Sequence, residues 1–225
     1  MQTDWFDASY WSKKGSLIGE SKGRHITWFI KSPEDNDERT WVLRHYYRGG
    51  LVSKLTADKF VFTSLQQTRG FREVTLLLDM IEMDLPVPTV IGARVIRKGL
   101  FYNADLLMEK IDAKDLVALL SDTGLSNTKL SQTHWNNIGK TIANFHRKGI
   151  YHADLNAHNI LIDASDKVWL IDFDRCEKRI IKTSWQQQNL QRLKRSFIKE
   201  KSLLTRFNFE DENWKELMDG YRSAM

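Results

Sequence analysis

The chain of 225 residues contains a single cysteine, Cys176. One cysteine cannot form a disulfide framework, which favours a reducing compartment, most simply the cytoplasm. The six histidines show no metal-ligand spacing, so we expect no zinc site. No apolar run resembles an N-terminal signal peptide, and none approaches the ~18 residues of a membrane-spanning helix. Internal repeats and low-complexity tracts are lacking too, so the sequence predicts a globular protein without a membrane span.

What the chain does contain fits that class. Hydrophobic residues make up 41% of it, and eight of the residues are tryptophans. This composition predicts a buried core rather than disorder. The formal net charge of +5 predicts a cationic surface, which suits phosphate-rich partners, nucleic acid or an anionic membrane. Charge alone does not choose among these partners.

The most informative motif is His-x-Asp-x-x-x-x-Asn at 152–159, followed by an apolar strand and Asp-Phe-Asp at 172–174. Phosphoryl transfer from ATP requires this set of groups. Asp154 would face the attacking hydroxyl as the catalytic carboxylate. Asn159 and Asp172 would offer the oxygen ligands that Mg²⁺ prefers. The motif predicts a kinase of the protein-kinase-like superfamily.

The residues around the motif supply the expected local structure. Residues 160–162 and 168–171 are apolar, and the polar residues 164–167 between them predict a hairpin. Such a hairpin would bring Asn159 and Asp172 side by side. We expect His152 to support the loop backbone rather than to transfer protons. The alternative interpretation makes Asp154 and Asp172 ordinary turn or cap residues and Asn159 a loop residue.

The first half of the sequence is rich in expected strands. Residues 26–30 and 40–44 predict a hairpin, preceded by the evenly spaced Gly15, Gly19 and Gly23. These glycines lack the G-x-G-x-x-G spacing, so a phosphate-covering loop formed by Gly19 and Gly23 competes with a plain turn. Further strands are expected at 90–95, 100–102 and 106–108.

A helix is expected between these strands. Its apolar stripe comprises Phe71, Val74, Leu77, Leu78 and Ile81, and the Pro-containing stretch 85–88 ends it. Later helices are expected after a Ser131 or Thr133 cap, from about 185 to 199, and from 214 to 221. The helix after the cap would bury Trp135, Ile138, Ile142 and Phe145 and end at Gly149.

This order of elements is that of a kinase small lobe, in which a basic strand residue grips the phosphates and pairs with a helix glutamate. Here the pair would be Arg44 and Glu73, both assigned to ATP binding. Lys31 and Lys54 are alternative phosphate ligands. Residues 108–111 would form the hinge, so that Glu109 and Ile111 meet the adenine. The expected lobes are residues 1–109 and 110–225.

Three departures from peptide-specific protein kinases concern the acceptor. No A-P-E sequence and no long activation segment follow residue 174. Asp174 stands where those enzymes have glycine, and Asn156 stands where a lysine usually holds the transferring phosphate. A small hydroxylated acceptor is therefore more plausible than a protein.

Several segments together closely resemble the bacterial 3-deoxy-D-manno-octulosonic acid (Kdo) kinases, and the likeness runs from about residue 10 to 221. The segments are Trp41-Val42-Leu43-Arg44-His45-Tyr46-Tyr47-Arg48-Gly49-Gly50, Leu85-Pro86-Val87-Pro88, residues 152–161, residues 170–175 and residues 189–196. Arg44, Asn156 and Asp174 look normal for this family.

The resemblance implies an α+β, protein-kinase-like bilobal fold with a strand-rich N-lobe and a helical C-lobe. It implies ATP-dependent phosphorylation, with Mg²⁺, of the 4-hydroxyl of Kdo on Kdo-lipid A. It places this substrate at the cytoplasmic face of the inner membrane. Because the chain is cationic and has no predicted span, we expect it to adhere peripherally to the anionic membrane surface, as a monomer and without nucleic acid. Arg48, Asn156 and Arg175 would contact the acceptor. Alternatives are a kinase for a core heptose or a protein, and a non-catalytic nucleotide-binding scaffold.

Overall fold

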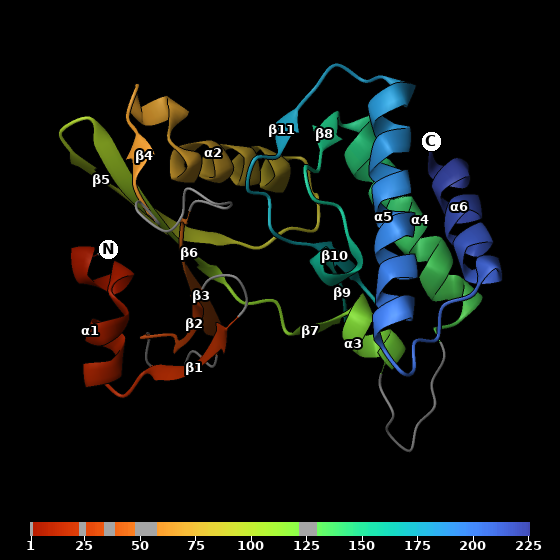
Figure 1. Cartoon of the computed structure of the whole chain (residues 1–225), viewed down its shortest axis with the longest axis horizontal. Helices are drawn as coiled ribbons and strands as arrows, with labels where there is room; N and C mark the ends of the chain where they lie inside the picture. The colour runs from red at the N-terminus through yellow and green to blue at the C-terminus, as the bar shows by residue number, and fades with distance from the viewer. Residues whose placement is uncertain (1, 23–25, 34–38, 48–57, 122–129) are drawn as a thin grey trace. The chain divides into compact units, whose positions relative to one another are not determined.

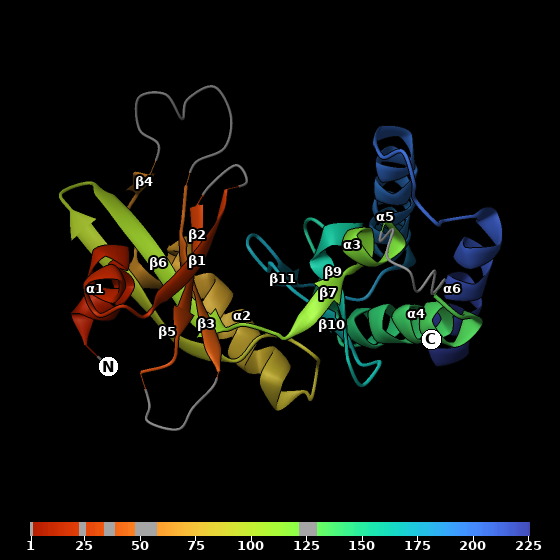
Figure 2. The same cartoon turned by 90° about the horizontal axis from the view of Figure 1, so that it is seen from below.

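The structure, a computed structural model, describes residues 2–22, 26–33, 39–47, 58–121 and 130–225. The chain divides into two compact units. The first comprises residues 1–79 and 88–110, and the second comprises residues 80–87 and 111–225. Figures 1 and 2 show that sheet dominates the first unit and helices dominate the second. The described residues therefore form a mixed α/β protein, as the sequence predicted.

The first unit is built on an antiparallel sheet, in which the described residues form six strands. The strands are β1 (Leu17–Lys22), β2 (Ile26–Lys31), β3 (Thr40–His45), β4 (Phe60–Val61), β5 (Val90–Lys98) and β6 (Phe101–Glu109). Strand β6 pairs with β5 along one edge and with β3 and then β4 along the other. This arrangement makes β6 the central strand of the unit.

The predicted hairpin of β2 and β3 is confirmed. Its register places Arg44 opposite Thr27 and Lys31 opposite Thr40, so the two candidate phosphate ligands lie at opposite ends of the hairpin. The prediction of separate strands at 100–102 and 106–108 is wrong, because β6 continues through Asp105. That carboxylate is buried, yet His45 and Arg94 satisfy it at 2.6 and 2.9 Å. A polar residue that looked like a break is thus part of the strand.

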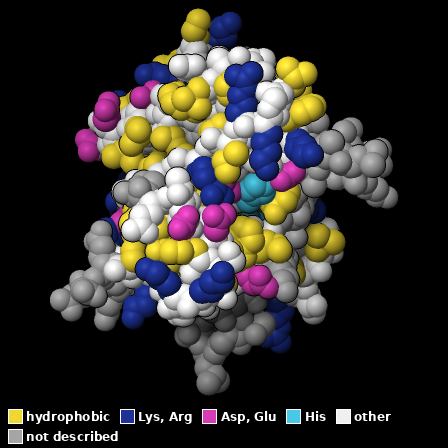
Figure 3. Space-filling model, turned by 90° about the vertical axis from the view of Figure 1, so that its left-hand side faces the viewer, with side chains coloured by type: hydrophobic (Ala, Val, Ile, Leu, Met, Phe, Trp, Pro, Cys, Tyr) yellow, Lys and Arg dark blue, Asp and Glu magenta, His cyan; other side chains and the backbone are white. Residues whose placement is uncertain are grey.

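One face of the sheet is covered by η1 (Thr3–Phe6) and α1 (Ala8–Lys13). Trp11 and Trp41 are buried there with Leu43, and the Trp11 indole donates a hydrogen bond to the Trp5 carbonyl at 2.7 Å. Because side chains alternate along a strand, Arg44 projects from the other face, toward α2. Figure 3 shows this unit from the side on which Figure 1 draws α1 and β5, with apolar side chains among lysines and arginines.

Helix α2 (Arg69–Glu82) follows the short η3 (Leu65–Gln67) and occupies the expected range. Its predicted apolar stripe is partly wrong. Phe71, Leu78 and Ile81 are exposed, whereas the buried face carries Glu73 together with Leu76, Leu77 and Met80. Because Glu73 is charged, the sequence pattern placed it off the buried face, and the predicted apolar stripe was displaced around the helix. The ion pair described below explains why Glu73 is there.

The second unit contains the predicted catalytic segments. Its elements are β7 (Ala113–Asp115), α3 (Leu116–Ser121), α4 (Gln132–Arg147), β8 (Ile150–Tyr151), η4 (Ala157–Asn159), β9 (Ile160–Asp163), β10 (Val168–Leu170), β11 (Glu177–Lys178), α5 (Thr183–Leu203) and α6 (Asp211–Ala224). Strands β9 and β10 form the predicted hairpin. The carboxylate of Asp163 closes its turn, because it accepts hydrogen bonds from the backbone of Ser165 and Lys167.

Of the two predicted caps, Ser131 is the one that begins helix α4. Its hydroxyl accepts the His134 N–H, while His134 Nδ1 accepts the Ser131 N–H. The four predicted core side chains are buried on this helix, and it ends before Gly149, which has φ +76°. Helices α4 and α6 approach backbone to backbone at Gly139 and Gly220. This contact fixes the helix that leads into the catalytic motif.

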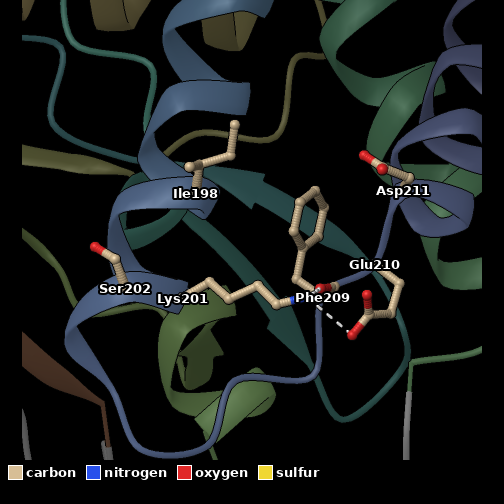
Figure 4. Close-up of a pocket in the computed structure, with 6 residues that line it drawn as sticks. All are labelled: Ile198, Lys201, Ser202, Phe209, Glu210 and Asp211. Atoms are coloured by element: carbon tan, nitrogen blue, oxygen red, sulfur yellow. Dashed lines mark hydrogen bonds and ion pairs between the residues drawn. The ribbon is translucent and has the colours of Figure 1, made fainter.

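The C-terminal end of α5 is tied to the start of α6. Lys201 Nζ donates to the Phe209 carbonyl at 2.7 Å and pairs with Glu210 at 2.9 Å (Figure 4). These three residues line a surface depression together with Ile198, Ser202 and Asp211. None of the predicted site residues lines this depression. Among the described residues, no helix combines the length and apolarity needed to cross a membrane.

Candidate active site

The loop after β8 is built around the buried side chain of His152. Its Nδ1 accepts the backbone N–H of Asp154 at 3.2 Å, so the proton lies on Nε2, which donates to the Ile171 carbonyl at 3.0 Å. Burial lowers the pKa of His152 and favours this neutral form. His152 therefore supports the backbone, as predicted, and ties the loop to the residue preceding Asp172.

Asp154 presents its carboxylate to solvent. The side chain is 59% exposed, and its Oδ1 accepts a hydrogen bond from Nη1 of Arg192 at 3.1 Å. Its backbone is fixed, because the Asp154 carbonyl accepts the side-chain amides of Asn156 and Asn159, both at 3.0 Å. The carboxylate is thus held at the surface, where a substrate hydroxyl has access to it.

The β9–β10 hairpin brings Asn159 next to Asp172 along the backbone, as predicted. The Ile171 N–H donates to the Asn159 carbonyl at 3.1 Å, and Asp172 follows directly. Asn159 is 8% exposed, and its amide nitrogen donates to the Asp154 carbonyl. The Asn159 Oδ1 therefore remains as the atom that could coordinate a metal. One amide oxygen and one carboxylate fit Mg²⁺, which keeps few protein ligands when phosphates and waters complete its shell.

The Asp-Phe-Asp segment has an unusual backbone. Asp172 and Arg175 have φ values of +63° and +61°, in the left-handed region that side chains other than glycine rarely adopt. Phe173 between them is buried and stacks on Phe145 of α4, with ring centroids 6.0 Å apart. The buried ring anchors a turn that sets the direction of Asp172. Such strained positions cluster at functional sites.

In the first unit, Arg44 and Glu73 form the predicted pair. Nη2 of Arg44 donates to Oε1 of Glu73 at 2.5 Å, and the Glu73 side chain is 2% exposed. Sequence reasoning missed Tyr46, whose hydroxyl donates to Glu73 Oε2 at 2.7 Å. Burial, reinforced by the Glu73 charge, raises the pKa of Tyr46 well above its usual value. The tyrosine adds a second hydrogen-bond donor to the Glu73 carboxylate, which fixes the orientation of Glu73 toward Arg44.

In the predicted hinge, the backbone N–H groups of Glu109 and Lys110 are hydrogen-bonded to other parts of the chain. The Glu109 N–H donates to Thr89 and the Lys110 N–H to Thr40, at 2.9 and 2.7 Å, while the Glu109 side chain pairs with Arg39. Within the described parts of the chain, the Ile111 N–H makes no hydrogen bond. Among residues 109–111, the Ile111 N–H is therefore the backbone donor that could bind a ligand.

The other predicted site residues have different settings. Gly19 lies in β1 at a register shift, and an added Cβ would make only an ordinary contact with Phe29 at 3.6 Å. Both ends of the Asn156 side-chain amide are used in the loop, on Asp154 and on the His158 N–H. Arg175 is 69% exposed. Gly23, Arg48 and Lys54 lie outside the described residues.

Comparisons with known proteins agree with this geometry. A sequence model of the lipopolysaccharide kinase (Kdo/WaaP) family matches residues 8–221. A 3-deoxy-D-manno-octulosonic acid kinase of Mannheimia succiniciproducens is 45% identical over 227 residues, covering 99% of this chain and 91% of that protein. Proteins of the same name from Vibrio vulnificus (strain YJ016) and Haemophilus influenzae (strain ATCC 51907) are 45% and 43% identical, covering 97% of this chain and 88% and 90% of theirs.

These similarities extend over nearly the whole sequence and include both predicted motifs. They define a phosphotransferase, the class that the sequence motif predicted. The chain belongs to the lipopolysaccharide kinase (Kdo/WaaP) family.

Proposed function

We propose that this chain transfers the γ-phosphoryl group of ATP to the 4-hydroxyl of Kdo on Kdo-lipid A, in the assembly of the lipopolysaccharide inner core. The observation that supports this most is the exposed carboxylate of Asp154. It lies on a loop that one hydrogen-bonded histidine ties to the strand end carrying Asp172. The names of the relatives supply the acceptor, and the geometry supplies the residues for the transfer.

In the reaction, Asp154 orients the acceptor hydroxyl and takes its proton as the oxygen attacks the γ-phosphorus. The bond from that phosphorus to the β–γ bridging oxygen breaks, and ADP leaves with the bond's electrons. The transition state is loose, so positioning of the hydroxyl matters more than strong basicity. The fixed backbone of Asp154 serves that purpose, because two side-chain amides hold its carbonyl.

Asn159 Oδ1 and the Asp172 carboxylate would hold Mg²⁺ on the phosphates. The ion supplies charge neutralisation of the β- and γ-phosphate oxygens when it is bound. The neighbouring backbones of the two residues, joined at Ile171, support this pairing. The buried Phe173 anchors the left-handed turn at Asp172, which restricts the backbone that carries the carboxylate.

Arg44 is the proposed phosphate ligand of the first unit. Nη2 of Arg44 donates to Glu73 at 2.5 Å and to the Tyr46 hydroxyl at 3.4 Å, so the guanidinium has a fixed position rather than the freedom of a surface side chain. Arginine presents several donors in a plane and keeps its charge, which suits a polyphosphate. Lys31, at the other end of the hairpin, is exposed and makes no side-chain contact of this kind with the described residues.

A lipid-linked acceptor requires contact with a membrane surface, and we propose a specific segment for it. Ile180 and Ile181 are 82% and 53% exposed, between the exposed Lys178 and Lys182. The segment is held from behind, because the Trp185 indole donates to the Ile180 carbonyl at 2.9 Å and the Arg179 N–H donates to Gly149 at 2.7 Å. Two exposed isoleucines between cations fit an anionic lipid surface.

All eight tryptophans lie in the described residues, and none of them is among the exposed large hydrophobic side chains, whereas Ile180 and Ile181 are. The two isoleucines lie six and seven residues after Asp174 in sequence, and they belong to the same unit as Asp154. Contact at this segment would therefore bring the lipid-borne sugar to the unit that carries the catalytic carboxylate.

An acceptor panel tests the proposed function. Purified enzyme is given radiolabelled ATP with Kdo-lipid A, with heptosylated core or with casein, and the phosphorylated carbon is identified by phosphorus–proton NMR. We expect label on Kdo-lipid A alone, at position 4. Label on heptose or casein would replace the proposed acceptor. Nucleotide binding without transfer to any acceptor would indicate a non-catalytic scaffold.

A further inference from the structure

Helix α5 carries an arginine directly beside the proposed catalytic carboxylate. Nη1 of Arg192 lies 3.1 Å from Oδ1 of Asp154, and the two side chains are 46% and 59% exposed. Among the described residues, Arg192 is the one cationic side chain within ion-pair distance of Asp154. The remaining donors of this guanidinium make no hydrogen bond within the described parts of the chain. The arginine therefore touches Asp154 and still presents free donors beside it.

The position of Arg192 is set by the helix on both sides. Three residues earlier, the Asn189 amide bonds to both the N–H and the carbonyl of His152, at 3.2 and 3.0 Å. Four residues later, the Ser196 hydroxyl accepts the Ala157 N–H at 3.0 Å. Residues spaced by three and four lie on one helix face, so this face of α5 is attached to the catalytic loop. Arg192 lies between the two attachments.

Stability alone does not account for this arrangement. An exposed ion pair contributes little to folding, ~0–1 kcal/mol. The asparagine at the position where protein kinases have a lysine is used inside the loop, on Asp154 and on His158. A cation for substrate anions must therefore come from elsewhere, and Arg192 is in the right place.

We propose that Arg192 is the anion-binding residue of the acceptor site: one guanidinium nitrogen orients Asp154, and the other donors bind an anionic group of the substrates. This inference rests on the proposed sugar-acid acceptor. Two groups share the required chemistry, the acceptor carboxylate and the transferring phosphoryl group, and both match the planar donor set of arginine. An anion bound there is held next to the hydroxyl that faces Asp154.

The test measures steady-state kinetics of Arg192→Gln and Arg192→Lys on Kdo-lipid A. In Arg192→Gln, the charged hydrogen bond to the substrate anion is lost. This loss should lower kcat/KM for the acceptor by about 10- to 100-fold. KM for ATP should stay within about twofold, and lysine should restore part of the activity. The matched control is Arg195→Gln on the same helix. Arg195 is exposed and has no side-chain partner among the described residues, so this variant should match wild type.

An acceptor whose carboxylate is a methyl ester distinguishes the two anions. If Arg192 binds the carboxylate, wild type should lose activity on the ester while Arg192→Gln treats acid and ester alike. If it binds the phosphoryl group, Arg192→Gln should lose the same factor on both acceptors, in kcat. Unchanged kcat/KM on both acceptors, in a variant whose melting temperature matches wild type, would overturn the inference. A wild-type enzyme inactive on Kdo-lipid A would instead refute the proposed function.

Discussion

Replacing Gly139 or Gly220 with alanine should destabilise the second unit, although alanine normally favours a helix by about 1 kcal/mol over glycine. A Cβ at Gly139 would lie 1.9 Å from the Leu217 carbonyl oxygen and 2.6 Å from the Tyr221 nitrogen. A Cβ at Gly220 would lie 2.1 Å from the Asn136 carbonyl oxygen. All these atoms belong to backbone, so no side chain can turn aside to make room.

The magnitude follows from the required movement. Helices α4 and α6 would have to separate by about 1.5 Å to bring the closest contact to an ordinary van der Waals distance. Overpacking of a well-packed contact typically costs ~1–3 kcal/mol and occasionally more. With two backbone contacts at Gly139, we expect Gly139→Ala to lower the free energy of unfolding by about 3 kcal/mol, near the upper end of that range.

Urea unfolding followed by circular dichroism measures this effect. Lys140→Ala, at the next position and exposed, is the matched control and should change the unfolding free energy by less than ~0.5 kcal/mol. Because both glycines serve one contact, the double variant should cost much less than the two single costs together. A Gly139→Ala variant more stable than wild type by about 1 kcal/mol would refute the close approach of α4 and α6.

Three further predictions concern pH, the membrane and ATP. Burial lowers the pKa of His146 from 6.5 to about 4, so the unfolded state binds the proton more tightly. The free energy of unfolding should therefore fall by about 3 kcal/mol as pH drops from 6.5 to 4, and urea titrations of His146→Gln should lack most of this loss. Replacing both Ile180 and Ile181 with serine should weaken binding to anionic vesicles, measured by sedimentation, about tenfold or more. The control Leu100→Ser, at an exposed leucine outside this segment, should bind like wild type. Equal binding by wild type and both variants would contradict the assigned surface. Glu73→Gln should raise KM for ATP about tenfold, because Arg44 loses its buried counter-ion, and an unchanged KM would remove Arg44 from the phosphate site.

The parts of the fold that depend on local signals could be predicted from the sequence. The Ser131 cap, the four core residues of α4 and the β9–β10 hairpin are encoded by neighbouring residues, through capping, 3.6-residue periodicity and strand alternation. The catalytic motif is local too, so the proximity of Asn159 and Asp172 followed from one hairpin. The pairing of Arg44 with Glu73 needed the order of elements typical of a kinase small lobe.

The features that could not be predicted depend on partners distant in sequence. Glu73 is buried because Arg44 and Tyr46 satisfy it, and this displaced the predicted apolar face of α2. Asp105 is a strand residue because Arg94 and His45 bind its carboxylate. Arg192 reaches Asp154 across 38 residues. No periodicity marks such polar contacts, because each exists only after two separate elements have been brought together.

The proposed role of Asp154 is the central claim, and the loss of its carboxylate tests it most directly. In Asp154→Ala, phosphoryl transfer to Kdo-lipid A should fall by about 10²–10⁴, while the affinity for Mg²⁺–ATP, measured by calorimetry, should stay within about twofold of wild type. Asp172→Ala is the comparison and should weaken Mg²⁺–ATP binding. Parallel loss of ATP affinity and transfer in Asp154→Ala, or transfer close to the wild-type rate, would contradict the account.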